Sequence, residues 1–149
     1  MSELVLRTDR GGLATLTLNR PDKLNALTVP MFLELRAHID RIAEQTDEVG
    51  LVMVRGAGKC FSAGNDLAGI AVGVEAPKPS FQSETIELLA NLPQPVISAV
   101  HGHCYTGALE LALAGDLIIA AQSARFGDTH SKWALTPRWG MSQRLPRRV

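Results

Sequence analysis

Apolar and polar residues alternate along the first part of the chain. This alternation is clear from Leu13 to Leu18, and a period of two predicts a strand with one buried face. An apolar segment around Val5 predicts an earlier strand, and residues 9–12, Asp-Arg-Gly-Gly, supply a turn between the two. A β-hairpin is therefore expected as the first structural unit.

Further along, the apolar residues take on the spacing of a helix. Residues 19–23 contain Asn, Pro and Asp, which predict a loop. A helix is then expected from about Thr28, with Pro30 in its first turn, where proline is tolerated. Its apolar positions recur along one helix face: Met31, Leu35, His38/Ile39 and Ile42.

Three later segments are continuously apolar and predict buried strands. They cover residues 51–54, 95–100 and 117–120, and the first is expected to be covered on both faces. Helices are expected between them, over 84–92 and from about 107 to 114. The Gly/Pro-rich residues 71–80 predict a mobile loop. Alternating strands and helices predict an α/β domain.

The composition is that of an ordinary globular domain. The 149 residues are 46% hydrophobic and 20% charged, which fits one soluble domain with a real core. Positive and negative side chains balance at 15 each, so no overall charge favours nucleic acid or a membrane. The most apolar segment, residues 111–121, contains Asp116 and is too short to span a bilayer. Two cysteines and no recognisable signal peptide predict a cytoplasmic protein.

Several conspicuous groups favour structural roles. Residues 56–58, Gly-Ala-Gly, lack the spacing of a nucleotide-binding loop. Residues 101–104, His-Gly-His-Cys, have no third ligand at a metal-site spacing, so a packing or loop-shaping role is expected and no metal. Cys60 and Cys104 are expected to be small buried hydrophobes. Two interpretations stay open for the arginines near the end, a solvated surface or contacts to a phosphate-bearing ligand: Arg138, Arg144, Arg147 and Arg148.

Two turns of small residues carry the strongest indication of chemistry. Residues 61–67, Phe-Ser-Ala-Gly-Asn-Asp-Leu, and residues 105–110, Tyr-Thr-Gly-Ala-Leu-Glu, each lead into an expected helix start. Backbone N–H groups at a helix start have no partner within the helix. Two such turns facing each other could direct two N–H donors at one oxygen atom, which is how a developing oxyanion is stabilised.

Two carboxylates lie at these turns. Asp66 is expected to cap its helix, because Asp is favoured at helix starts, with an acid/base role as the alternative. Glu110 lies among apolar residues, where burial without a partner would raise its pKa and suit it to proton transfer. The alternative for Glu110 is a salt bridge or an exposed position.

These segments resemble the enoyl-CoA hydratase/isomerase (crotonase) superfamily. Residues 19–27, Asn-Arg-Pro-Asp-Lys-Leu-Asn-Ala-Leu, are followed by 61–67 and then by 107–116 in the order typical of that superfamily. Phe126-Gly127 and residues 143–146, Gln-Arg-Leu-Pro, extend the similarity across nearly the whole chain. The resemblance implies an α/β spiral of ββα units that assembles into trimers or hexamers. It also implies an acyl-CoA thioester ligand whose enolate is stabilised, with coenzyme A as part of the substrate and no separate cofactor.

The resemblance also implies roles for individual residues. The N–H groups of Asn65 and Gly107 would form the oxyanion hole, and Glu110 matches the first of two catalytic glutamates. The second glutamate is replaced by His130, and histidine could share the work because its ordinary pKa is about 6.5. Asp128 lies two residues away and would be aimed differently. The residues expected to bind substrate are Lys23, Leu24, Ala63, Asp66, Leu67 and Ala68, with Lys23 as a phosphate contact.

The resemblance leaves three functions open. Hydration of an enoyl-CoA is the leading hypothesis, with Glu110 activating water and His130 assisting proton transfer. Isomerisation or other enolate chemistry is the second, because one carboxylate is replaced. A non-catalytic acyl-CoA-binding protein is the third. Superfamily members continue into further helices, so residues 1–149 are expected to form the N-terminal core without the helical trimerisation region.

Overall fold

The chain begins with the expected β-hairpin. The computed structural model describes residues 3–71 and 75–149. Strand β1 (Val5–Arg10) pairs antiparallel with β2 (Leu13–Leu18). The turn consists of Gly11 and Gly12, whose φ angles of 55° and 80° are left-handed and favour glycine. The hairpin prediction is confirmed, with residues 9 and 10 completing the first strand.

The first long helix, α1 (Val29–Glu44), begins where the sequence predicts it. The Thr28 hydroxyl accepts a hydrogen bond from the Met31 N–H at 3.3 Å and caps the helix. The preceding loop contains one short 3₁₀ turn, Pro21–Lys23. The buried face of α1 follows the predicted spacing: Met31, Phe32, Leu35, Ile39 and Ile42.

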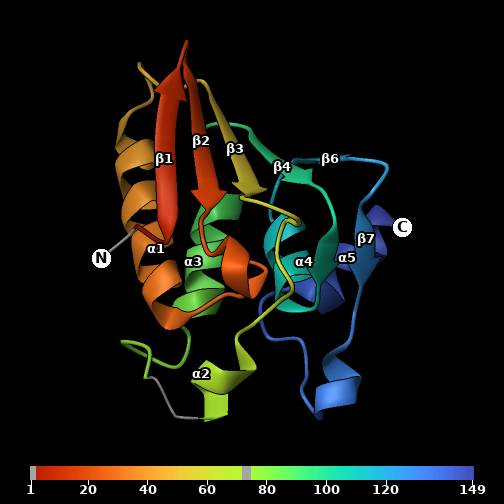
Figure 1. Cartoon of the computed structure of the whole chain (residues 1–149). Coiled ribbons are helices and arrows are strands. Elements are labelled where there is room, and N and C mark those ends of the chain that lie inside the picture. The colour runs from red at the N-terminus through yellow and green to blue at the C-terminus, as the bar shows by residue number, and fades with distance from the viewer. Residues whose placement is uncertain (1–2, 72–74) are drawn as a thin grey trace.

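Five strands form the main sheet, in the order β1-β2-β3-β4-β6. Strands β3 (Leu51–Gly56), β4 (Val96–Val100) and β6 (Leu117–Ala120) continue the sheet in parallel from β2. Helix α3 (Phe81–Ala90) packs against α1, and Figure 1 shows α1 beside the red hairpin strand and α3 behind the neighbouring strands. Each segment that the sequence predicted as a strand therefore forms one in the structure.

The predicted burial of these strands is partly wrong. In β3 and β4 only alternate side chains are buried, and the others are half-buried or exposed. In β6, Leu117 is 60% exposed and Ile119 is 57% exposed. The reason is that α1 and α3 cover one face of the sheet, while β6 lies at its edge. Continuous apolar sequence did not distinguish a two-sided strand from an edge strand.

A second layer gives the chain a repeating order. Strands β5 (His103–Tyr105) and β7 (Arg125–Gly127) form a parallel pair of their own. Each follows a strand of the main sheet and precedes helix α4 (Gly107–Ala112) or α5 (Met141–Arg148). The order β-β-α thus occurs in β1-β2-α1, β4-β5-α4 and β6-β7-α5.

Some boundaries differ from the sequence prediction. The helix expected over 84–92 covers 81–90, and the helix expected over 107–114 ends at 112. The predicted loop 71–80 lies partly outside the described residues, and residues 75–80 form neither helix nor strand. None of the helices in the described segments is long and apolar enough to cross a membrane.

Candidate functional site

The two turns singled out in the sequence lie against each other. The Ser62 N–H donates to the His103 carbonyl at 3.0 Å, and the Tyr105 N–H donates back to the Ser62 carbonyl at 3.4 Å. Gly64 has a φ of 105°, and a Cβ there would come within 2.8 Å of the Tyr105 carbonyl oxygen. Glycine therefore allows a close approach that a larger residue would prevent. The expectation that the two turns meet is confirmed.

Thr106 sets the direction of the second turn. Its φ of 55° and ψ of −115° are unusual for a residue with a side chain. Two contacts hold it there: the Thr106 N–H donates to the Gly127 carbonyl at 2.8 Å, and the Thr106 and Thr129 hydroxyls lie 2.6 Å apart. This conformation begins α4 at Gly107.

A cleft of about 670 Å³ opens between the turns and the C-terminal segment. Four residues predicted as reactive line it together, namely Asn65, Gly107, Glu110 and His130. Within the described part of the chain, neither the Asn65 N–H nor the Gly107 N–H donates a hydrogen bond to another residue. Two residues whose backbone N–H groups have no partner among the described residues therefore line the same cleft as Glu110.

Glu110 is buried with uneven contacts to its two oxygens. Only 1% of the residue is exposed. Its Oε1 accepts hydrogen bonds from the Trp139 N–H at 2.7 Å and the Met141 N–H at 3.2 Å. Its Oε2 lies 3.6 Å from His130 Nε2. Burial raises the pKa of the Glu110 carboxyl, although these donors oppose the shift.

His130 lies between two carboxylates. It is 6% exposed, and its Nδ1 lies 2.6 Å from Asp128 Oδ1, opposite the nitrogen that faces Glu110. The same Asp128 oxygen accepts the His130 backbone N–H at 3.0 Å. That backbone hydrogen bond is the main cause that lowers the pKa of Asp128, and the imidazole adds to it. Asp128 is thus aimed at His130 rather than at Glu110.

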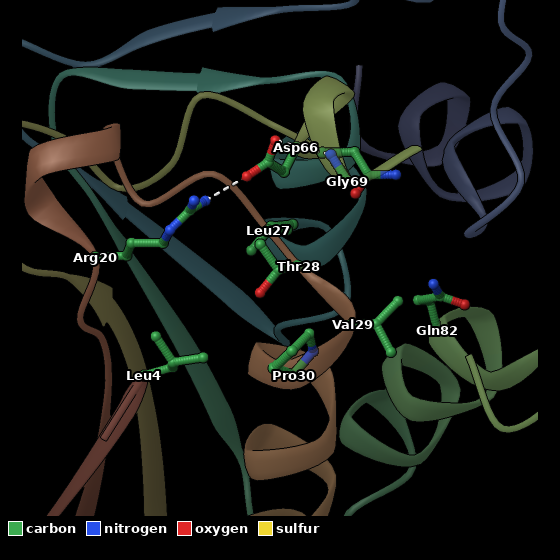
Figure 2. Close-up of a pocket in the computed structure, with 10 residues that line it drawn as sticks. Leu4, Arg20, Leu27, Thr28, Val29, Pro30, Asp66, Gly69 and Gln82 are labelled. Atoms are coloured by element: carbon green, nitrogen blue, oxygen red, sulfur yellow. Dashed lines mark hydrogen bonds and ion pairs between the residues drawn. The ribbon is translucent and has the colours of Figure 1, made fainter. Parts of the chain in front are cut away.

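Asp66 has a different environment, shown in Figure 2. One oxygen pairs with Arg20 Nη1 at 2.5 Å, and the other accepts the N–H groups of Ala68 at 3.0 Å and Gly69 at 3.3 Å. The Arg20 hydrogen bond is the main cause that lowers the pKa of Asp66. The expected capping role is confirmed, at the start of α2 (Leu67–Ala71). The Arg20–Asp66 pair borders a second pocket of about 330 Å³ with an apolar side at Leu4 and Pro30.

Comparison with known proteins decides the family. The family model described as enoyl-CoA hydratase/isomerase matches residues 8–149. The chain belongs to this family.

Relatives within the enoyl-CoA hydratase/isomerase family support the same assignment. The 1,2-epoxyphenylacetyl-CoA isomerase of Escherichia coli is 38% identical over 154 residues, covering 99% of this chain and 58% of that protein. The "Probable enoyl-CoA hydratase 1, peroxisomal" of Arabidopsis thaliana is 33% identical over 142 residues, covering 95% of this chain and 53% of that protein. The chain therefore spans somewhat more than half the length of these curated relatives.

A solved structure confirms the fold of this family member. The enoyl-CoA hydratase of Bacillus anthracis superposes with a TM-score of 0.87 at 34% identity, covering 97% of this chain and 57% of that one. The expected crotonase-like α/β fold is therefore confirmed, in agreement with the β-β-α repetition.

The six residues expected to bind substrate do not line the cleft that contains Glu110. Lys23 ends the 3₁₀ turn, and Leu24 is 38% exposed with a left-handed φ of 52°. The Ala63 N–H donates to the Leu24 carbonyl at 2.9 Å, so this segment runs beside the first turn. Leu67 and Ala68 begin α2. None of these five residues lines either cavity, and their binding roles stay predictions.

Asn25 connects these segments and was not predicted to do so. It is completely buried with a left-handed φ of 52°. Its Nδ2 donates to the Ala57 and Cys60 carbonyls at 2.8 and 2.9 Å, and its Oδ1 accepts the Arg20 N–H at 2.9 Å. The Asn25 carbonyl also accepts the Ser62 hydroxyl at 2.7 Å. The tolerance of Asn for left-handed backbone is the signal that could have indicated this role.

The donors to Glu110 were also missed. Trp139 and Met141 are 29 and 31 residues away in sequence and contribute backbone N–H groups, which any non-proline residue possesses. The Trp139 ring packs edge-on against Phe32 at 5.1 Å between centroids. It also lies so near Gly107 that a Cβ there would come within 2.5 Å of the ring. Sequence spacing gives no indication of these contacts.

The remaining candidate groups have local partners. His101 Nε2 lies 2.9 Å from the Gly58 carbonyl, which fits the predicted loop-shaping role for this histidine. Cys60 and Cys104 are buried as predicted, and burial raises the pKa of the Cys104 thiol to about 12. No cluster that could hold a metal ion occurs within residues 3–71 and 75–149.

Most of the C-terminal arginines bind carbonyl oxygens or a carboxylate. Arg144 pairs with Glu87 and donates to the Trp139 carbonyl at 2.9 Å. Arg148 donates to the Asp116 carbonyl at 2.9 Å. Arg138 differs because it lines the cleft. Arg144 and Arg148 are thus held by protein groups, which neither of the two interpretations anticipated, and a phosphate contact stays a prediction for Arg138.

Proposed function

We propose that this protein adds water to the 2,3-double bond of an enoyl-CoA. One observation carries the proposal: Asn65 and Gly107, whose backbone N–H groups have no hydrogen-bond partner among the described residues, line the same cleft as a buried acid and a histidine. Backbone donors fixed in this way stabilise negative charge on an oxygen without reorganising during the reaction. A thioester carbonyl is a group that develops such charge when a nucleophile adds to the conjugated double bond.

The proposed reaction proceeds through an enolate held by Asn65 and Gly107. Water adds through its oxygen to C3, and the electron pair of the double bond moves toward the thioester oxygen. Glu110 accepts a proton from the water, and the Glu110–His130 pair returns one proton to C2 as the enolate collapses. One proton is taken and one is given, so the pair ends in its initial state. A carboxyl with a raised pKa suits this exchange near neutral pH.

The coenzyme A portion would lie along the segments beside the first turn. We propose Lys23 as a phosphate contact and Leu24, Ala63, Asp66, Leu67 and Ala68 as the wall along the ligand. Coenzyme A enters as part of the substrate, so the proposal includes no separate cofactor. Lys23→Ala is expected to raise KM with little change in kcat, because its contact would be the same in substrate and transition state. The homotrimer or hexamer and the cytoplasmic location stay predictions.

Isomerisation of an enoyl-CoA is the second candidate. It is favoured by the replacement of the second carboxylate with His130, since moving one proton between C2 and C4 needs a single acid/base. The similarity to the 1,2-epoxyphenylacetyl-CoA isomerase, which is named as an isomerase of an acyl-CoA, supports this candidate. In this reaction the same oxyanion donors would stabilise the dienolate, and no water would be added.

The two candidates differ in their products. The chain is supplied separately with a 2-enoyl-CoA and a 3-enoyl-CoA, and products are separated by chromatography. Hydration gives a 3-hydroxyacyl-CoA from the 2-enoyl substrate, whereas isomerisation converts one enoyl-CoA into the other. Glu110→Gln should abolish either activity, and Glu44→Gln, at an exposed position at the end of α1, is the matched control. Binding of acyl-CoA with no turnover of either substrate would favour the non-catalytic alternative.

A further inference from the structure

The Asp128 side chain contacts both the backbone and the imidazole of His130. It lies between the end of β7 at Gly127 and the short 3₁₀ helix that begins at His130. Its Oδ1 is 2.6 Å from His130 Nδ1 and 3.0 Å from the His130 backbone nitrogen. The Asp128 side chain is 42% exposed, whereas the His130 side chain is 8% exposed. A surface carboxylate therefore reaches inward to the buried imidazole.

The contact determines which nitrogen of His130 carries a proton. Asp128 is ionised near neutral pH, because the His130 N–H and imidazole lower its pKa. An ionised carboxylate only accepts hydrogen bonds, so the nitrogen at 2.6 Å must carry a proton. His130 Nδ1 is therefore the donor to Asp128, and Nε2 is the nitrogen presented to Glu110.

The facing atoms of His130 and Glu110 then need one proton between them. Nε2 and Oε2 lie 3.6 Å apart in a site where both side chains are almost fully buried. If both atoms were unprotonated, two acceptors would face each other away from water, which is costly. One proton, on either atom, changes this repulsion into attraction. Oε1 of Glu110 cannot hold the shared proton, because it already accepts hydrogen bonds from two backbone N–H groups.

We propose that Asp128 is a positioning residue that fixes His130 with Nδ1–H toward itself, so that Glu110 and His130 share a single exchangeable proton. The assignment rests on the proposed function for its kinetic consequence. During turnover a proton enters the pair from water and another leaves to C2, while Asp128 neither gains nor loses one. The Asp128–His130–Glu110 arrangement would thus take the place of two carboxylates.

Nuclear magnetic resonance of the imidazole tests the assignment without turnover. The chain labelled with ¹⁵N at histidine is compared with Asp128→Asn, and the His130 signals are assigned by their loss in His130→Gln. Asn keeps an oxygen that can accept the His130 backbone N–H but removes the charge, so the Asx-turn at the start of the 3₁₀ helix is preserved. Asp40→Asn removes a carboxylate that is 55% exposed and paired with Arg36, and serves as the matched control.

The expected result is a protonated Nδ1 in the unaltered chain and in Asp40→Asn. In Asp128→Asn the ¹⁵N chemical shifts of Nδ1 and Nε2 should approach each other, because the imidazole becomes a mixture of its two neutral tautomers. Unchanged His130 shifts in a folded Asp128→Asn variant would overturn the proposal, as would an unprotonated Nδ1 in the unaltered chain. Asp128→Ala, which also removes the acceptor of the His130 backbone N–H, should change the His130 ¹⁵N shifts at least as much.

Kinetics separate this assignment from the proposed function. Asp128→Asn should lower kcat by roughly tenfold to a hundredfold, since a charge-assisted hydrogen bond is lost, with little change in KM. If the unaltered chain turns over no enoyl-CoA but keeps the protonated Nδ1, the proposed function fails and the positioning role stands. If turnover is present and Asp128→Asn keeps full kcat, the positioning role is overturned and the proposed function stands.

Discussion

Asp66 and Glu110 are carboxylates in closely comparable places, yet their surroundings differ. Each follows a turn of small residues and lies at the beginning of a short helix. Asp66 has donors on both oxygens, from Arg20 and from two backbone N–H groups. Among the described residues, Glu110 has two donors on one oxygen, while the other oxygen lies 3.6 Å from an imidazole nitrogen. The Arg20 hydrogen bond lowers the pKa of Asp66, whereas burial raises the pKa of Glu110.

This difference shows that position at a helix start does not decide whether an acid is structural or reactive. A carboxylate whose lone pairs are all used by fixed donors has a strong preference for the ionised state. A carboxylate that is buried and incompletely paired can exchange a proton near neutral pH. Burial and the donors at each oxygen together therefore separate the two roles, and substitutions can test that separation.

The largest expected effect is on turnover. Glu110→Gln should lower kcat for enoyl-CoA by about 10²- to 10⁴-fold, the usual contribution of a general acid/base. Its amide oxygen can still accept the Trp139 and Met141 N–H groups, so the fold should persist. Asp66→Asn should keep kcat within a few-fold. A folded Asp66→Asn variant that loses more turnover than Glu110→Gln would contradict the comparison.

A methyl group at each helix provides the next test. Gly107→Ala would place a Cβ within 2.5 Å of the Trp139 ring, whereas at Gly69 the nearest side-chain atom is 3.9 Å away. Moving Trp139 would disturb the N–H that binds Glu110. We expect Gly107→Ala to lower kcat/KM by about tenfold to a hundredfold, since misplaced catalytic groups lose rate steeply. Gly69→Ala is the matched control, and equal losses in both would show that Trp139 is not the cause.

Stability should respond in the opposite order. Asp66→Ala should lower the free energy of unfolding by about 1–3 kcal/mol, because it leaves donors without an acceptor and Arg20 without its partner. Glu110→Gln should leave stability unchanged or raise it by roughly 1 kcal/mol, since the buried carboxylate is costly when ionised. Denaturant unfolding measures both. Asp40→Ala, at an exposed ion pair, should change stability by less than about 1 kcal/mol.

The smallest expected effects are the pH dependences of these stabilities. The folded-state pKa of Glu110 is raised. The contribution of this carboxyl to the free energy of unfolding is therefore fully present below its ordinary pKa of about 4.3 and is lost as the pH rises through its folded-state pKa. Because the folded-state pKa of Asp66 is lowered, its contribution is present above about 3.9 and is lost as pH falls through the folded value. The differences between the unaltered chain and Glu110→Gln or Asp66→Asn should therefore slope in opposite directions. Parallel slopes would contradict the assigned surroundings.

The sequence was sufficient where local patterns determine structure. The start of α1 could be predicted because Thr28 caps it and Pro30 is compatible with its first turn. The meeting of the two turns could be predicted because their small residues permit close approach. The exposure of β6 could not, because an apolar segment such as residues 117–120 has the same pattern at the edge of a sheet as at its centre.

The two turns and the reactive side chains of the candidate site were predictable, but the contacts that hold those side chains were not. Glu110 and His130 could be chosen by residue type and by the resemblance, and they line one cleft. The Trp139 and Met141 contacts come from backbone N–H groups about thirty residues away, and sequence spacing does not encode such contacts. Asp128 was noticed as a nearby carboxylate, but its direction depends on the turn between β7 and the following 3₁₀ helix.

The buried amide of Asn25 has a consequence for ligand length. Its oxygen accepts the Arg20 N–H, just before Lys23, and its nitrogen donates to the Ala57 and Cys60 carbonyls, beyond the end of β3. The backbone near Lys23 is therefore tied to the backbone that leads to Asn65. A molecule that contacts Lys23 at one end and the Asn65 N–H at the other must match a fixed separation. Asn25 would then select the length of the coenzyme A portion of the ligand, whatever acyl group it bears, without itself contacting the ligand.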